Sequence, residues 1–282
     1  MTRVDQFESV FRSASKEVYR RTEIGFSHVH VVTDLEGAAE ADFTRQLRVF
    51  LDVLGGDVAW TNADRQEASD LGLFLKSVEA QRPDLVCTYR NLFSESWRYP
   101  YSLGEHVDVL TQVAHCPVLV LPHPLSERTS TVGGTRHVLA MGGHLTGDHS
   151  LVDWALRMTT EDGTLRIAHI EDDQIFERYV EAISKIPSIN TDEARTTIET
   201  QLLKEPREYI ESVSRMLAES GSKVTVETEV RMGHHLSEYR RLIDEHAVDL
   251  LVMHTKDEDQ LAMHGLAYPL AVELRDTPLL LL

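Results

Sequence analysis

Residues 248–254 read Val-Asp-Leu-Leu-Val-Met-His, and the chain closes with Thr-Pro-Leu-Leu-Leu-Leu at residues 277–282. Between these two apolar runs lie a polar loop and a helix-like segment that follows Gly265. The same order occurs earlier, where Asp-Leu-Val-Cys-Thr at residues 84–88 is followed by Cys-Pro-Val-Leu-Val-Leu at residues 116–121. Short apolar runs of this kind are typical of parallel strands that are buried on both faces. The repeated ending therefore predicts an α/β fold of two similar halves.

Strand-like and helix-like segments alternate through both halves, a pattern typical of parallel sheets with right-handed crossovers. The strand-like segments of the second half are residues 137–141, 165–170, 224–230, 248–253 and 279–282. Those of the first half are residues 29–32, 57–60, 84–88 and 118–121. The first half therefore has one β-α unit fewer than the second.

The boundary between the halves is predicted in the linker of residues 122–134, which is rich in turn-forming residues. We expect one domain over residues 1–124 and another over residues 133–282.

Two segments have no counterpart in the other half. We interpret residues 171–205 as a helical insertion that is interrupted at Pro187 and again at Pro206. The segment Phe7–Tyr19 is predicted to be an amphipathic helix that covers the N-terminal part of the fold.

The chain of 282 residues is acidic, with 46 Asp and Glu against 28 Lys and Arg and a formal charge of −18. A field of this sign repels nucleic-acid phosphates and acidic membrane surfaces, so neither is expected as a partner. No apolar run approaches the ~20 residues that span a bilayer. The N-terminus interleaves apolar with charged residues, unlike a signal peptide, so we expect a cytoplasmic protein.

The repeated endings resemble the universal stress protein family. Its members typically show D-L-[IV]-V-M-G, a glycine-containing loop, G-[ST] at the start of a helix, and then C-P-V-L-V. The best matches are Asp249–Met253 and Cys116–Val120. The resemblance implies two Rossmann-like parallel-sheet domains of the adenine nucleotide alpha hydrolase-like type. It implies the strand order 3-2-1-4-5 in the second half and a reduced four-stranded order 2-1-3-4 in the first.

Members of this family commonly pair through the last strand of the sheet. Two copies on one chain would replace that contact, so we expect Val118–Leu121 and Leu279–Leu282 to meet in an internal pseudo-dimer. Unpaired apolar edges are otherwise a liability. The resemblance also implies a protein partner that the sequence does not identify, and it allows a further homodimer.

In the ATP-binding branch of the family the loop reads G-x-x-G, nine residues, then G-[ST], so that backbone N–H groups close around the phosphates. In the second half of this chain His254 and Asp257 stand at the glycine positions, and Leu266 follows Gly265. In the first half an acidic residue follows Gly104. Because the acidic loop would repel the phosphates, we expect no ATP binding by the family motif.

The aspartate that the family places near the adenine aligns with Gly142 in the second half, whereas Asp34 stands at that place in the first half. If a cofactor binds the second half, the resemblance places it against Gly142, Gly143, His254, Thr255 and Gly265. The identity of any cofactor stays open.

Histidines gather at the predicted carboxyl edge of the second half, which is where ligands bind in open α/β sheets. His144, His254 and His264 could approach one another, with a carboxylate from Asp257–Asp259 nearby. Neutral imidazoles are good ligands for zinc or nickel, and a histidine cluster could also respond to acidification. No HExxH or paired CxxC motif accompanies them, so we favour the alternative that they are polar loop residues.

The glycine-rich loop from Gly142 to Asp148 could present backbone donors to an anion. We favour a structural role in which Asp148 caps the helix that carries Leu151. Ser150 is next to His149 in sequence, but the members of a catalytic triad meet through the fold. No nucleophile elbow or phosphate-binding loop is present.

The sequence therefore favours a non-enzymatic stress-response or regulatory binding protein. Two alternatives stay open. One is an adenine-nucleotide sensor with weak ATP hydrolysis, and the other is a transition-metal or histidine-cluster site, in its enzymatic form a metal-dependent hydrolase.

Overall fold

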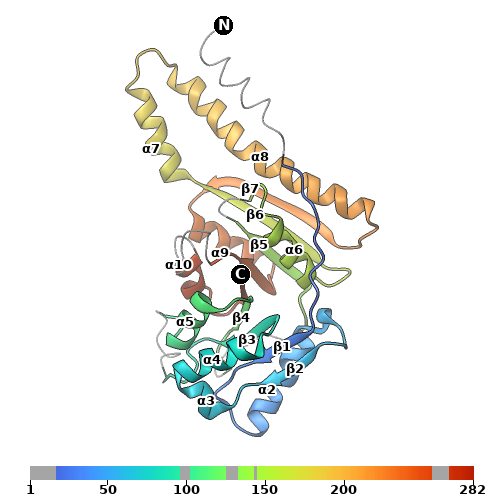
Figure 1. Ribbon diagram of the computed structural model, residues 1–282. Coiled ribbons are helices and arrows are strands. Elements are labelled where there is room, and N and C mark those ends of the chain that lie inside the picture. The colour runs from blue at the N-terminus through green and yellow to red at the C-terminus, as the bar shows by residue number, and fades with distance from the viewer. Residues whose placement is uncertain (1–16, 96–101, 125–132, 143–144, 256–266) are drawn as a thin grey trace.

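The computed structural model describes residues 17–95, 102–124, 133–142, 145–255 and 267–282. In this part of the chain, helices flank a nine-stranded, mostly parallel sheet, so the predicted α/β class is confirmed (Figure 1). The strands are β1 (His28–Val31), β2 (Ala59–Asn62), β3 (Leu85–Tyr89), β4 (Val118–Leu121), β5 (His137–Met141), β6 (Thr164–Asp172), β7 (Thr225–Gly233), β8 (Leu250–Met253) and β9 (Leu279–Leu281). The helices are α2 (Ala38–Phe50), α3 (Arg65–Ser69), α4 (Leu71–Gln81), α5 (Glu105–Val113), α6 (His149–Met158), α7 (Asp173–Ser184), α8 (Thr191–Glu219), α9 (His235–Glu245) and α10 (Ala267–Glu273), with a 3-10 helix at Asp52–Leu54.

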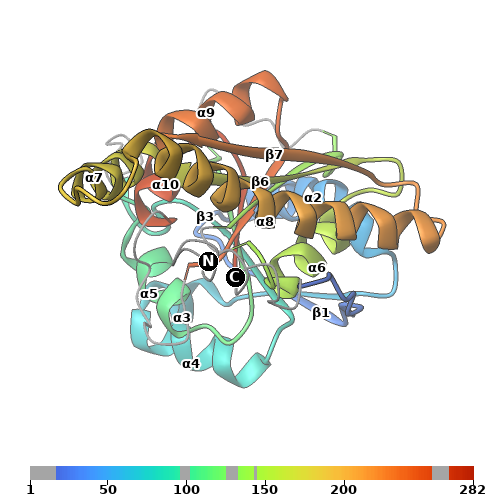
Figure 2. The ribbon, with the colours of Figure 1, turned by 90° about the horizontal axis from the view of Figure 1, so that it is seen from above.

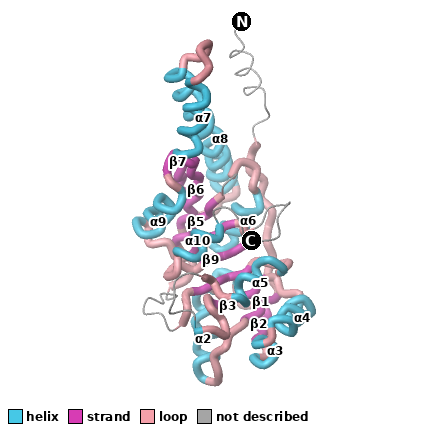
Figure 3. Tube along the Cα trace, turned by 90° about the vertical axis from the view of Figure 1, so that its left-hand side faces the viewer, coloured by secondary structure: helices cyan, strands magenta, loops and turns pink. Residues whose placement is uncertain are grey.

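The strands follow the order β2-β1-β3-β4-β9-β8-β5-β6-β7 from one end of the molecule to the other (Figure 3). Neighbouring strands are parallel except β4 and β9, which are antiparallel, with Leu119 opposite Leu280. Numbered within each half, the order is 2-1-3-4 over β1–β4 and 3-2-1-4-5 over β5–β9. The halves therefore meet at their last strands and share one sheet.

Interior strands are apolar because other elements cover both of their faces. Every residue of β4 and of β8 is buried. The edge strand β2, Ala59–Asn62, has no fully buried residue. Continuous apolar runs therefore mark the interior strands more clearly than the edges.

The two halves repeat one set of hydrogen bonds. Asp84, just before β3, accepts from the backbone N–H groups of Ser27 (2.7 Å) and His28 (2.9 Å) at the start of β1. Asp249, just before β8, accepts in the same way from the two N–H groups at the start of β5, at 3.1 and 2.8 Å. These bonds tie the first strand of each half to its neighbour, which explains why an aspartate opens both apolar endings.

His30 is a polar residue within the core of the first half, and only 1% of it is exposed. Its Nδ1 atom lies 2.8 Å from Thr61 Oγ1, whereas its Nε2 atom has no partner among the described residues. Burial, together with the neighbouring His28, lowers the pKa of His30 to about 4. The folded protein therefore holds this imidazole neutral at pH 7.

Acidification is expected to destabilise the fold through His30. Because an unfolded histidine has a pKa of about 6.5, the unfolded chain binds a proton that the folded chain excludes. Stability is then lost as the pH falls from about 6.5 toward 4, by about 2 kcal/mol between pH 7 and pH 5. Urea unfolding at both pH values should show a smaller loss in a His30→Leu variant than in the wild type. Equal losses in the two proteins would contradict this assignment.

Residues 17–27, which we call the N-terminal strap, leave the first half and contact the second. The N–H of Tyr19 donates to Ser212 Oγ on α8 at 2.9 Å, and its hydroxyl donates to the Asp153 carboxylate on α6. The N–H of Thr22 donates to the same carboxylate, at 3.1 and 3.2 Å from its two oxygens. The strap thus joins the two halves at a second place besides the β4–β9 pairing.

The predicted helix Phe7–Tyr19 is wrong at its C-terminal end, because residues 17–19 are not helical. There the N–H of Tyr19 bonds to a side chain of the second half instead of to a helical carbonyl. The remainder of that prediction, residues 7–16, lies outside the described residues.

Helices α7 and α8 extend beyond the sheet (Figure 1), and α8 lies alongside β7 (Figure 2). Helix α7 ends before Pro187, but the predicted interruption at Pro206 is wrong, because Pro206 lies inside the 29-residue helix α8. An internal proline costs a helix about 3 kcal/mol. Here Pro206 is buried together with its neighbours Leu203 and Tyr209, and this packing offsets the lost hydrogen bond. None of the described helices has both the length and the apolar character needed to cross a bilayer.

Candidate functional site

At the edge of the sheet where the strands of the first half have their carboxyl ends, other residues pack around Asp34, which follows β1. The hydroxyl of Tyr89, at the end of β3, donates to Asp34 Oδ1 and lies 3.0 Å from both Thr33 Oγ1 and the Asp34 nitrogen. The N–H of Phe93 donates to Asp34 Oδ2 at 2.8 Å. Both carboxylate oxygens of Asp34 are therefore hydrogen-bonded within the protein.

The aromatic ring of Tyr89 fills this strand end. It is fully buried and makes edge contacts with Phe43 and His123, at centroid distances of 5.2 and 5.3 Å. Burial, and next the hydrogen bond to Asp34, raise the pKa of Tyr89 well above its ordinary value. Tyr89 therefore stays a protonated donor, and its ring fills the space beside Asp34.

The glycine that opens α5 serves close packing. Gly104 has a φ of 93°, and a Cβ added there would lie 2.7 Å from the Cα of Asn91. Asn91 adopts a left-handed conformation with a φ of 57°, and its N–H donates to the Leu103 carbonyl at 2.6 Å. The backbone of the loop after β3 therefore lies against the N-terminus of α5.

At the equivalent end of the second half, His254 follows β8 and faces Asp148. Its Nε2 atom lies 3.1 Å from each carboxylate oxygen. Asp148 also accepts a hydrogen bond from the N–H of Leu151 at 3.0 Å, so the predicted cap of α6 is confirmed. This carboxylate is therefore held by both the histidine and the helix.

Two other predicted ligand residues are bonded to neighbouring strands. The N–H of Gly142 points to the Ala168 carbonyl at 3.5 Å, and the hydroxyl of Thr255 donates to the Leu282 carbonyl at 2.9 Å. The remaining predicted site residues lie outside the described part of the chain: Gly143, His144, His264 and Gly265. Within that part, no three His, Cys, Asp or Glu side chains converge as metal ligands.

Of the neighbouring residues Asp148, His149 and Ser150, the first two contact side chains from other parts of the fold. His149 Nδ1 lies 2.8 Å from the hydroxyl of Tyr209, and the two rings stack at 5.8 Å. Asp148 contacts His254 and Leu151, as described above. The structure thus gives His149 a phenol partner on α8, which nothing in the local sequence indicated.

Comparison with known proteins gives structural similarity alone. No protein-family model matches the sequence, and no curated protein sequence matches it significantly. A structure described as a candidate universal stress protein from Pseudomonas aeruginosa is 14% identical, with 100% of this chain and 88% of that chain covered and a TM-score of 0.47. A universal stress protein from Archaeoglobus fulgidus is 9% identical, with 91% and 86% covered and a TM-score of 0.49.

A protein of unknown function from Pseudomonas aeruginosa is 15% identical, with 90% of this chain and 81% of that chain covered and a TM-score of 0.45. The chain is thus similar to solved universal stress protein structures, the same family that its sequence motifs resemble.

Proposed function

We propose that the chain is a tandem stress-protein-like regulatory module that acts in the cytoplasm by binding a protein partner, without catalysis and without a nucleotide pocket of the family type. The observation that supports this most directly is the closure around Asp34. Its two carboxylate oxygens accept from Tyr89 and Phe93, and the buried ring of Tyr89 fills the space beside them where a ribose or an adenine would have to enter.

The loop after β3 and the charge of the chain support the same proposal. A phosphate chain would need the space before α5, and the backbone of Asn91 lies there. A formal charge of −18 also opposes the approach of a triphosphate. Opening this site would require Tyr89 to leave a fully buried position, which costs about 2–3 kcal/mol in apolar burial alone.

Calorimetry with magnesium-ATP and with AMP tests the proposal. We expect no heat of binding, and no rise in melting temperature at 1 mM nucleotide. A ligand present at 100 times its Kd stabilises a protein by about 2.7 kcal/mol, so even a Kd near 10 μM would shift the melting temperature by several degrees. The matched control is Tyr89→Ala, which removes the ring from the strand end. A saturable nucleotide signal in the wild type that is lost in Asp34→Asn would overturn the proposal.

The metal-site alternative concerns His254, the one predicted ligand for which a carboxylate neighbour is described. Zinc titration of chelator-treated protein decides it. If His254 only hydrogen-bonds to Asp148 and binds no metal, zinc produces no saturable heat and no stabilisation. Stoichiometric zinc binding that His254→Ala abolishes would favour the metal site.

A further inference from the structure

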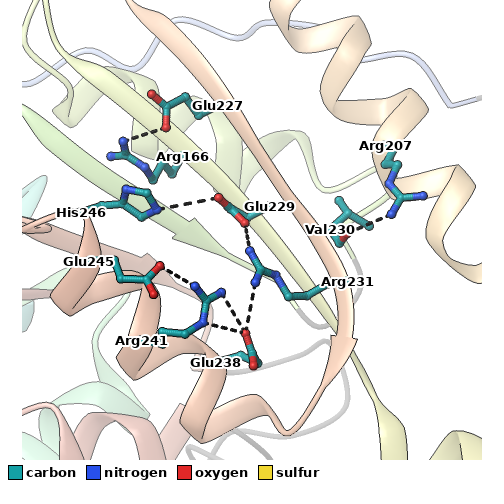
Figure 4. Close-up of polar contacts among 10 residues, drawn as sticks. All are labelled: Arg166, Arg207, Glu227, Glu229, Val230, Arg231, Glu238, Arg241, Glu245 and His246. Atoms are coloured by element: carbon teal, nitrogen blue, oxygen red, sulfur yellow. Dashed lines mark hydrogen bonds and ion pairs between the residues drawn. The ribbon is translucent and has the colours of Figure 1, made fainter.

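Strand β7 forms one edge of the sheet and, among the described strands, pairs only with β6. Its backbone direction is fixed by two hydrogen bonds. The N–H of Thr225 points toward β6, where it bonds to the Gly163 carbonyl at 3.0 Å. The carbonyl of Val230 points the other way and accepts from Arg207 of α8 at 3.1 Å (Figure 4). Because backbone direction alternates along a strand, the even-numbered residues of β7 direct their N–H and C=O groups outward.

The outward groups belong to Val226, Thr228, Val230 and Met232. Apart from the Val230 carbonyl, none of them has a hydrogen-bond partner in the part of the chain that the structure describes. Unpaired N–H and C=O groups make this edge a template for pairing with another strand, and α8 contacts the edge at Val230, which is buried. Thr228, at its middle, is exposed.

Charged side chains alternate along one face of β7 and join a network with β6 and α9 (Figure 4). The pairs are Glu227 with Arg166, Glu229 with Arg231 and His246, Glu238 with Arg231 and Arg241, and Glu245 with Arg241. Along the strand itself the order is Glu227, Glu229, Arg231. The face therefore has an acidic end and a basic end.

We propose that two copies of this chain associate through β7, strand against strand and antiparallel, with Glu229 at the two-fold axis. In this register every outward residue meets an outward residue: Thr228 faces Val230 of the second copy, and Val226 faces its Met232. Glu227 then lies opposite Arg231 of the other copy, twice in the dimer. Opposite charges at such cross-strand positions stabilise a pair, whereas like charges oppose it.

Neighbouring antiparallel registers are less favourable. Moving the axis by one residue, to Thr228 or to Val230, leaves the outward residue at one end of β7, Met232 or Val226, without a partner within the strand, whereas the axis at Glu229 pairs all four outward residues. The two facing Glu229 side chains are compensated, because each is already bound by an Arg231 and lies 3.8 Å from His246. The second copy thus supplies hydrogen-bond partners for the outward groups of β7, and it places opposite charges next to each other across the interface.

Sedimentation of the full chain from 5 to 500 μM tests the dimer, in 0.15 and 0.5 M NaCl because the charge of −18 repels the second copy at low salt. The expected result is a concentration-dependent species of twice the 31.9 kDa chain mass. Thr228→Pro removes an outward N–H without touching the β6 ladder and should weaken association at least about tenfold. Thr228→Lys, which keeps the backbone intact, should act in the same direction.

Two further variants sharpen the test. Thr200→Lys places the same charge on an exposed position of α8 and should leave association unchanged. Arg207→Met frees the Val230 carbonyl and should strengthen association by about tenfold, since the dimer gains two backbone hydrogen bonds. A wild type that sediments as a monomer at every concentration would overturn the proposal, as would a dimer that both Thr228 variants leave intact. The dimer does not depend on the proposed function.

Discussion

A chain that begins at residue 133 is expected not to reach the native fold alone, although it contains all five strands of the second half. In the full chain β9 lies between β8 and β4, and Leu279–Leu281 are at most 2% exposed. Removing the first half uncovers one edge of β9. It also removes the acceptors of Arg157, whose guanidinium donates to the carbonyls of Ile24 (3.1 Å), Val53 (2.8 Å) and Leu54 (3.0 Å).

The cost is large relative to the total stability of a domain, which is about 5–15 kcal/mol. The fragment would leave the buried Asp153 carboxylate without its strap donors and Arg157 without its carbonyls, each worth about 1.5–3 kcal/mol per charged hydrogen bond. We expect a poorly dispersed NMR spectrum and no cooperative thermal transition from residues 133–282 alone.

Co-expression provides the matched control. Residues 1–124 and 133–282 made as two chains should co-purify and unfold together, because β4, β9 and the strap are all present. A fragment of residues 133–282 that unfolds cooperatively near the melting temperature of the full chain would show that the second half is independent.

The α/β class could be predicted because the interior strands are buried on both faces and therefore read as short apolar runs. The sequence pattern predicted the ends of the outer strands less well. Strand β6 continues to Asp172 and β7 to Gly233, beyond their apolar parts, because a strand near the edge carries charged residues such as Arg231 on a wetter face. Periodicity reports burial, so it is weakest where burial is partial.

The N-terminal strap could not be predicted, because its partners are distant in sequence. Nothing near Tyr19 indicates that its hydroxyl will meet Asp153, and an amphipathic pattern there suggested a helix instead. Tertiary hydrogen bonds to α6 and α8 override that local preference.

The candidate site was partly accessible from the sequence. The absence of the loop glycines and the placement of Asp34 and Asp148 followed from the motif and from capping rules. The sequence did not indicate which side chains pack around Asp34, because Tyr89 resembles the other apolar residues of its strand. A loop whose left-handed residues are asparagine and phenylalanine likewise gives little local signal.

Replacing Asp153 by alanine is expected to destabilise the full chain by about 3–4 kcal/mol. Asp153 is only 6% exposed, and its carboxylate accepts from the hydroxyl of Tyr19 and the N–H of Thr22. Burial, and next this carboxylate, hold the pKa of Tyr19 well above its ordinary value, so the phenol remains a donor at neutral pH. Without Asp153 the hydroxyl of Tyr19, a residue that is only 3% exposed, stays enclosed and loses its acceptor.

Urea unfolding of the wild type and four variants separates this effect from a general loss of packing. Tyr19→Phe deletes one donor and should cost about 1–2 kcal/mol. Asp162→Ala, which breaks an exposed ion pair with Arg136, should cost less than about 0.5 kcal/mol. If the strap acts through this carboxylate, Tyr19→Phe should cost much less in the Asp153→Ala background than in the wild type. Additive losses would mean instead that the Tyr19 hydroxyl stabilises the junction independently of the Asp153 carboxylate.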